Sequence, residues 1–328
     1  MKVLVVGKRN SILQWYEHVL AADVPGVTLT GFALNHRNEI EHLGNYIDKV
    51  FRGLTFWDTA NRRLMKFLAD YRPEMVVIAD RFYLAGGVDE TLAALGVPVC
   101  QWVGDRFEDR LFANRCVTHF FYTDSGLLAE AQRMGDARGH YLPLAVDPAR
   151  FAVARPWAQR SPEPLFIGAW SENREAQLSG VRVPLAVYGK GWDRMRGTPH
   201  RIHARNISLA RVAALYGAHK LVLNVINSNN IVSGLNMRCF EAPAAGACLV
   251  TDRVADLPHC YEAGREVAVY DGAQELNEVL ASLQHDDQRA AGMAAQGRQR
   301  CLAEHTYARR IAAMVNIVGI NAAGIQPR

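Results

Sequence analysis

The sequence predicts an α/β protein built from two tandem Rossmann-like domains. Short apolar runs alternate with amphipathic segments, starting with "VLVVG" (3–7) and starting again with "LFIGAW" (165–170). Continuous apolar runs separated by helices are typical of parallel strands that are buried on both faces. The chain has 328 residues, a length at which a single hydrophobic core gives way to two.

The first half follows this alternation from its first strand onward. Strands are indicated by runs of four or more apolar residues, and helices by apolar residues spaced three or four apart. The expected strands span 3–7, 27–34, 75–80, 97–103, 118–124 and 140–146. The expected helices begin near Ser11 and cover 61–71 and 125–135.

A proline-rich segment, "DPARFAVARPWAQRSPEP" (147–164), interrupts the pattern and is interpreted as the interdomain linker. Beyond it, strands are expected at 165–170, 184–192, 220–226, 247–252 and 266–271, with a helix over 209–219. From Ala273 the chain is helical, and its last helix has no strand to follow. We therefore expect domains at 1–150 and 151–305, with residues 306–328 packing back on the first domain.

Composition excludes several classes of protein. The net charge is +4 and the basic residues do not cluster, which argues against nucleic-acid binding and favours a small anionic ligand. The six cysteines are scattered without C-x-x-C spacing, which argues against disulfides and a zinc site. No apolar segment is long enough for a signal peptide or a transmembrane helix, so a cytoplasmic location is expected, with peripheral membrane contact left open.

Ligands of open α/β sheets bind beyond the carboxyl ends of the strands, so the residues that follow each strand are the candidates. In the first half, "GKRNS" places Gly7 before a helix start, where backbone N–H groups face an anion or a sugar as readily as they form an ordinary turn. Asp105 leads the loop "GDRFED" and is a candidate to orient a sugar or an acceptor.

Two cationic candidates follow strands of the second half. In "SENREAQL", Arg174 lies in the first turn of a helix, where a cation works against the helix dipole, which suggests an external anion; the alternative is a solvated surface arginine. Lys190, in "YGKGW", could reach a phosphate, although the spacing of a P-loop is missing and an exposed turn lysine explains it as well.

The segment "SGLNMRCFEAPAAGACLVTD" (233–252) carries the densest set of candidates. We expect Ser233 to cap a helix from about Leu235, and the amides of Gly234, Leu235 and Asn236 to meet a phosphate. Glu241 would accept hydrogen bonds from two vicinal hydroxyls, as on a ribose. The alternative is a structural N-cap followed by a buried Glu241 paired with Arg238.

The sequence contains no motif for a metal site, a hydrolase or a dinucleotide-binding domain. There is no D-x-D pair for a metal-bound diphosphate, and His200 and His203 have no third ligand at useful spacing, so no metal is expected. The sequence contains neither the G-x-S-x-G of hydrolases nor the G-x-G-x-x-G of dinucleotide-binding domains.

The segments "FIGAWSENREAQL", "LAVYGKGW", "LYGAHKLVLNV", "GLNMRCFEAPAAGACLVTD" and "REVAVYDGAQELNEVL", in this order, resemble the donor half of GT-B glycosyltransferases, close to the CgeB-like branch of the GT4-type group. The resemblance implies that Glu241 is the second acid of an E-x7-E signature that contacts the donor ribose. It implies that residues 234–236 and Arg174 meet the donor diphosphate. The first acid of the signature falls on Ser233, and a histidine of the family's first domain falls on Gly104.

The resulting hypothesis is a retaining, metal-independent glycosyltransferase that moves a sugar from a nucleotide-diphosphate sugar to a hydroxyl acceptor, whether a glycan, a protein or a small molecule. No permanently bound cofactor is expected. A nucleotide-sugar 2-epimerase shares the tandem layout but requires carboxylates and a histidine gathered in the cleft. A hinged, non-enzymatic binding module is the third reading, and the lack of a signal peptide speaks against it.

Overall fold

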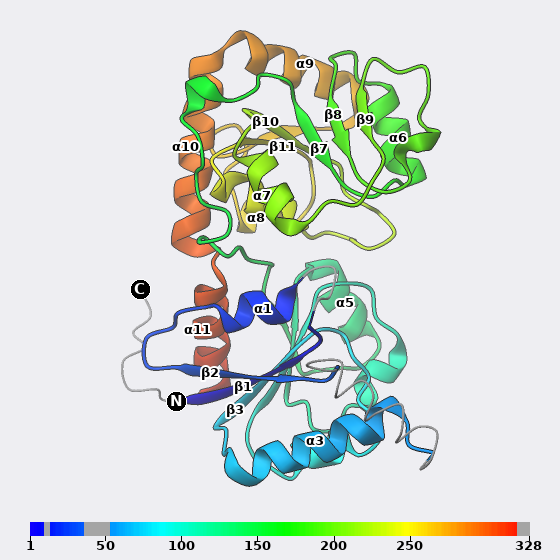
Figure 1. Ribbon diagram of the computed structural model, residues 1–328, viewed down its shortest axis with the longest axis vertical. Coiled ribbons are helices and arrows are strands. Elements are labelled where there is room, and N and C mark those ends of the chain that lie inside the picture. Colours follow the sequence, from blue (N-terminus) through cyan, green and yellow to red (C-terminus); the bar gives the residue numbers. More distant parts are fainter. Residues whose placement is uncertain (10–13, 36–52, 320–328) are drawn as a thin grey trace. The chain divides into compact units, whose positions relative to one another are not determined.

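A computed structural model describes residues 1–9, 14–35 and 53–319 (Figure 1). The chain divides into two compact units. The first comprises Met1–Leu142 together with Tyr307–Arg328, and the second comprises Pro143–Thr306. Each unit contains a six-stranded parallel sheet, so the predicted pair of Rossmann-like domains is confirmed.

The sheet of the first unit has the strand order β2-β1-β3-β4-β5-β6. Its strands are β1 (Lys2–Gly7), β2 (Thr28–Ala33), β3 (Met75–Ala79), β4 (Val99–Val103), β5 (His119–Tyr122) and β6 (Gly139–Tyr141). The helices of this unit are α1 (Trp15–Leu20), α3 (Phe56–Asp70), α4 (Val88–Ala93), α5 (Ser125–Arg133) and α11 (Tyr307–Val318), with a 3-10 turn η1 (Asp109–Ala113).

Helix α3 shows how the first sheet is covered. Leu64 and Leu68 pack in one apolar cluster with Leu4 and Val6 of β1, while α1 lies on the other side of that strand (Figure 1). The helix begins at Phe56, five residues earlier than expected, because Thr55 and Asp58 form a reciprocal capping box. The residues where an earlier helix was expected to start, 10–13, lie outside the described part.

The C-terminal helix α11 belongs to the first unit. The ring of Tyr307, its first residue, stacks on His18 of α1 with the ring centroids 5.3 Å apart, and packs edge-on against Trp102 of β4. Tyr307 and Ile311 are buried there. The last helix therefore returns to the first domain, as the sequence predicted.

The sheet of the second unit has the order β12-β11-β10-β7-β8-β9. Its strands are β7 (Leu165–Ile167), β8 (Ala186–Tyr188), β9 (Arg201–His203), β10 (Leu221–Asn224), β11 (Cys248–Asp252) and β12 (Ala268–Tyr270). The helices are α6 (Glu172–Ser179), α7 (Leu209–Tyr216), α8 (Arg238–Ala244), α9 (Gly272–His285) and α10 (Asp287–Glu304), with 3-10 turns η2 (Trp157–Gln159), η3 (Trp192–Arg194) and η4 (Leu257–His259).

Strand β9 was not predicted, because its segment reads as a polar loop. The strand has three residues and lies at the edge of the sheet, where it pairs with β8 through Tyr188 and His203. An edge strand buries little side-chain surface, so its sequence carries no apolar run. The missed strand extends the second sheet without altering its centre.

Candidate functional site

The topology of the second sheet identifies where a ligand would bind. Strand β7 comes first in the sequence and lies at the centre, with β8 and β9 on one side and β10, β11 and β12 on the other. This is the strand order 3-2-1-4-5-6 of dinucleotide-binding sheets, and its switch point lies between β7 and β10. Ligands of such sheets bind at the carboxyl ends of the strands that flank the switch point.

Arg238, the first residue of α8, spans this switch point. Its guanidinium donates to the carbonyl oxygen of Ile167 at the end of β7 and to the side-chain oxygen of Asn224 at the end of β10. Its Cζ lies 4.9 Å from the centroid of the Phe166 ring. The side chain is buried, and its Nε makes no hydrogen bond to the described residues.

Arg174 of α6 reaches the same place from the other side. Its Nε donates to the carbonyl oxygen of Val225 (3.0 Å) and its Nη1 to that of Ala169 (2.9 Å). Its Cζ lies 5.8 Å from the centroid of Phe166, the ring that Arg238 also approaches. The expectation that this cation meets a ligand rather than bulk solvent stays a prediction, but Arg174 is only 8% exposed.

Arg174 carries its charge at an energetic cost. Burial and, to a smaller extent, the neighbouring Arg238 lower the pKa of Arg174 to about 9, and Asp252 opposes both effects. The hydrogen bonds of the two guanidinium groups go to neutral oxygens, those of Val225, Ala169, Asn224 and Ile167, and the Tyr216 hydroxyl is a further neutral partner of Arg238. Neither group has an ion pair within the described part of the chain. Buried cations without a contacting carboxylate form a site for an external anion.

Glu241 lies one turn into α8 and is 6% exposed. Burial raises the pKa of its carboxyl to about 7, against the opposing influence of Arg238 and Arg150. Among the described residues, none donates a hydrogen bond to this carboxylate and none pairs with it at ion-pair distance. A buried acceptor without an internal partner is suited to donors that arrive with a ligand.

Helix α8 begins at Arg238, so the expected start near Leu235 was wrong. Asn236 explains the shift: its side-chain oxygen accepts the backbone N–H of Arg238 (3.1 Å), while its amide donates to Asn224 (2.8 Å). Ser233 does not cap the helix, and its carbonyl accepts the N–H of Asp256 (3.0 Å).

The loop before α8 contains the remaining predicted phosphate contacts. Gly234 and Leu235 are buried in that loop rather than in a helical turn, so their amides are not those of a helix start. The loop leads directly to Asn236, which contacts Asn224 and Arg238. Contact between the backbone of this loop and a ligand stays a prediction. Arg174 and Arg238, with the oxygens that hold them, are called the arginine cluster.

Lys190, another predicted site residue, makes no side-chain hydrogen bond or ion pair with the described residues of this cluster. Its side chain is exposed, and its carbonyl accepts the N–H of Trp170 (2.9 Å). The neighbouring Gly189 adopts φ +145°, and a Cβ there would lie 1.9 Å from the carbonyl oxygen of Gly168. Only glycine fits this close approach of two strand ends.

The first unit has its own switch point, between β1 and β3. Asp80 follows β3 and Asp105 follows β4, and Asp105 forms an ion pair with Arg81 (3.5 Å). Burial raises the pKa of Asp80, and Asp105 adds to that effect, whereas Lys8 and Arg81 oppose it. Asp105 was predicted from the sequence and Asp80 was not, although Asp80 ends "MVVIAD" and the same strand-end rule applies to it.

Gly7 ends β1 and has a packing role. A Cβ at this position would lie 2.7 Å from Cδ2 of Tyr16, so the glycine lets α1 pack against the strand. Gly104, where the resembled family has a histidine, is confined in the same way, because a Cβ there would lie 2.5 Å from the Trp15 ring. The indole of Trp15 therefore fills the space beside position 104.

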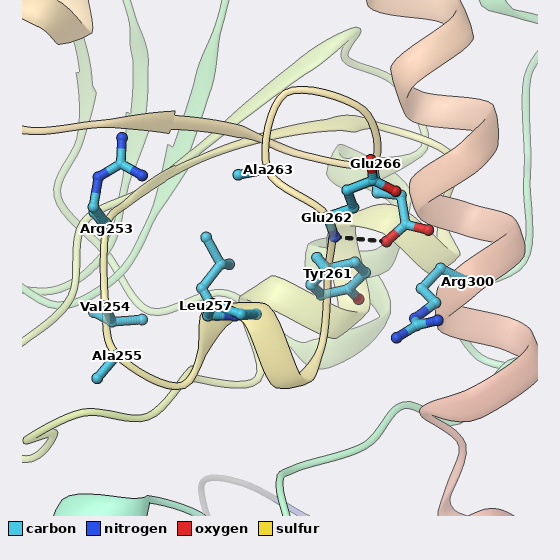
Figure 2. Close-up of a pocket in the computed structure, with 10 residues that line it drawn as sticks. Arg253, Val254, Ala255, Leu257, Tyr261, Glu262, Ala263, Glu266 and Arg300 are labelled. Atoms are coloured by element: carbon cyan, nitrogen blue, oxygen red, sulfur yellow. Dashed lines mark hydrogen bonds between the residues drawn. The ribbon is translucent and has the colours of Figure 1, made fainter.

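A separate pocket of about 640 Å³ opens beside the loop that follows β11 (Figure 2). Its charged lining groups are already engaged by the protein, as in the pairs Arg253–Asp271 (2.7 Å) and Arg300–Glu304 (2.8 Å). Glu266 accepts the backbone N–H of Glu262 (2.8 Å), the dashed line in Figure 2. No charged group is left over to select a ligand, so we place the candidate site at the arginine cluster.

The described residues contain no group of three or more His, Cys, Asp or Glu side chains that could hold a metal ion. None of their helices combines the length and the apolar character needed to cross a bilayer.

Comparison with known proteins finds a similarity in the second half of the chain. Residues 164–316 match a family model described as glycosyl transferase-like. The match covers the strands and helices that build the arginine cluster. No curated protein matches the sequence.

Solved structures share the fold at low sequence identity. HepE from Anabaena in complex with UDP is 11% identical, with 97% of this chain and 100% of that chain covered and a TM-score of 0.62. Sucrose-phosphate synthase from Thermosynechococcus elongatus is 14% identical, with 96% and 98% covered and a TM-score of 0.64. A glycosyltransferase from Rickettsia africae is 9% identical, with 97% of each chain covered and a TM-score of 0.65. The chain thus has the two-domain GT-B fold.

Proposed function

We propose that this chain is a glycosyltransferase of the GT4-type, CgeB-like group that transfers a sugar from a nucleotide-diphosphate sugar to a hydroxyl acceptor. The observation that carries the proposal is the pair of buried arginines, Arg174 and Arg238, held by neutral oxygens at the switch point of the second sheet. A diphosphate supplies the negative charge that this pair lacks. Recognition of a nucleotide is also supported by the strand order of the sheet.

The donor is proposed to bind in three parts. Its diphosphate contacts Arg174 and Arg238 and the backbone of the 234–236 loop, with Lys190 reaching the outer phosphate. Its ribose hydroxyls donate to the carboxylate of Glu241, for which the described part of the chain supplies no donor. HepE, a structure of the same fold, was solved in complex with UDP and glucose, which makes UDP-glucose the first donor to test.

Catalysis is proposed to rest on stabilising the departing nucleoside diphosphate. Negative charge grows on the phosphate oxygens as the glycosidic bond breaks, and preorganised cations in a buried site stabilise that charge strongly. The arginines take the part that a metal ion plays in other transferases, so the proposal includes metal independence. Retention of configuration follows when the leaving phosphate accepts the acceptor's proton on the face it departs from.

Asp105 is proposed to orient the acceptor or the donor sugar from the first unit. Its carboxylate is 30% exposed and is held by Arg81, so it can accept a hydrogen bond from a hydroxyl group. Asp80, whose pKa burial raises and whose charge Asp105 influences, is proposed to share that task.

A thermal-shift screen with UDP-, GDP-, dTDP- and ADP-sugars tests the donor assignment, since a ligand that binds only the folded state raises the unfolding midpoint. We expect a shift with one nucleotide and none with its nucleoside. No shift with any of the four would overturn the assignment. Release of the free nucleotide only when an acceptor is present would distinguish transfer from epimerisation.

Substitution of Arg174 tests the catalytic proposal. Arg174→Ala should lower turnover by about 100-fold or more while weakening nucleotide affinity much less, because the charge that the arginine stabilises grows in the transition state. Equal losses in turnover and affinity would assign Arg174 to ground-state binding only.

A further inference from the structure

Asn224 is the most highly connected polar side chain of the candidate site and is fully buried. Its oxygen accepts from Nδ2 of Asn236 (2.8 Å) and from the guanidinium of Arg238. Its Nδ2 donates to Oγ1 of Thr251 (2.9 Å) and lies 3.5 Å from a carboxylate oxygen of Asp252. A guanidinium only donates, so the atom that faces Arg238 must be the oxygen, which fixes the orientation of the amide.

A carboxylate would be the usual partner for an arginine at this depth. An aspartate at position 224 would fit the same volume and would accept a charge-assisted hydrogen bond from Arg238. It would also cancel the charge of Arg238 at its closest contact. The neutral amide holds the guanidinium in place and leaves its charge available.

Asp252 of the neighbouring strand β11 does not form an ion pair with Arg238 in the described structure. Asp252 accepts the backbone N–H of Ile226 (2.9 Å) rather than an arginine. Burial raises the pKa of Asp252, and the backbone hydrogen bond and Arg238 act against this effect.

We infer that Asn224 is a positioning residue that orients Arg238 through a neutral acceptor and thereby makes the switch point selective for a multiply charged anion such as a diphosphate. The inference rests on the proposed function in that it concerns the same site. It adds Asn224 as the residue whose neutral side chain holds Arg238 without neutralising its charge.

The first test is Asn224→Asp, which changes one atom and one charge. Calorimetric titration with inorganic pyrophosphate at pH 7.5 should show binding at least tenfold weaker than in the native protein, because a buried negative charge next to Arg238 acts on the anion at low effective dielectric. The variant replaces the contact of Nδ2 with Asp252 (3.5 Å) by two neighbouring carboxylates, so some loss of stability is expected, and binding is measured well below the unfolding midpoint of the variant. Unchanged pyrophosphate affinity would overturn the inference.

The pH dependence of pyrophosphate binding distinguishes an effect of the new charge at position 224 from an effect of altered shape. Around position 224 lie Arg238 and Cys239 of α8, Thr251 and Asp252 of β11, Tyr270 of β12 and Arg174 of α6. Protonation of the introduced carboxyl at low pH restores a neutral acceptor there. The ratio of variant to native dissociation constants should therefore shrink as the pH falls, and a ratio independent of pH would point to a purely structural defect.

Two further variants, which change the charge at position 252, test the role of charge independently. Asp252→Asn removes the opposing carboxylate and should tighten pyrophosphate binding severalfold. The double variant Asn224→Asp/Asp252→Asn moves one negative charge without changing the total, and most of the lost affinity should return. A double variant that binds as weakly as Asn224→Asp alone would contradict the role of charge.

Binding of pyrophosphate and UDP-glucose distinguishes a wrong donor assignment from a wrong role for Asn224. A native protein that binds neither pyrophosphate nor UDP-glucose would remove the anion site and the donor assignment together. A native protein that binds both, with variants that bind equally well, would leave the glycosyltransferase proposal standing and remove the role of Asn224.

Discussion

Glu241 links the stability of the second unit to its proposed ligand. Its pKa of about 7 lies above the ordinary value of 4.5, so between these two pH values the folded protein holds a proton that the unfolded chain releases. Stability therefore falls as the pH rises through this window, and the loss is complete above about pH 7. At 1.36 kcal/mol per pKa unit, the ionised carboxylate costs the native state about 3 kcal/mol.

Glu241→Gln removes this cost and keeps the shape of the side chain. Urea unfolding at pH 8 should show the variant to be more stable than the native protein by about 3 kcal/mol, and the difference should vanish near pH 4. Glu262→Gln serves as the matched control, because Glu262 lies on the surface and pairs with Arg265. That change should alter stability by less than about 1 kcal/mol at both pH values.

The same variant should lose its ligand as it gains stability. An amide accepts hydrogen bonds from ribose hydroxyls less strongly than a carboxylate, so the affinity for UDP-glucose should fall at least tenfold at pH 8. A Glu241→Gln protein that is less stable at pH 8 would refute the burial argument. One that is more stable but binds UDP-glucose normally would refute the assignment of the ribose contact.

Two further predictions concern the first unit. Gly104→Ala should destabilise the protein by about 1–3 kcal/mol in thermal or urea unfolding, because the new methyl group meets the Trp15 ring, and a smaller residue in place of Trp15 should recover part of the loss. Asp105→Asn should change stability by less than about 1 kcal/mol, since the pair with Arg81 is partly exposed, yet lower the transfer rate at saturating donor at least tenfold. An unchanged rate would leave Asp105 without a role in transfer.

The periodicity of the sequence predicted the architecture because buried parallel strands need continuous apolar runs. The periodicity did not predict elements whose bounds depend on a local hydrogen bond or on a position at the sheet edge. The side chain of Asn236 accepts the backbone N–H of Arg238, the first residue of α8, and no pattern in the sequence distinguishes that turn from a cap by Ser233 three residues earlier. Strand β9 satisfies its backbone at a sheet edge with a polar sequence.

The candidate site was predictable only in part. Arg174 and Glu241 stand out because a charge interrupts a helix start or an apolar run. Asn224 does not, since it sits within "KLVLNVI" and its importance comes from partners 12 to 28 residues away along the chain. Asp80 and Asp252 follow their strands directly, and applying the strand-end rule to every strand would have identified both.

The arginines of the switch point serve the fold as well as the proposed ligand. Where β7 and β10 diverge, the carbonyl groups of Ile167 and Val225 turn away from the sheet ladder, and Arg238 and Arg174 satisfy them. Removing either guanidinium leaves a buried carbonyl without its donor, so stability and activity fall together. A loss of activity in Arg174→Ala therefore does not by itself identify a ligand contact. The ratio of lost turnover to lost affinity does, because an unsatisfied carbonyl group lacks any preference for the transition state over the bound donor.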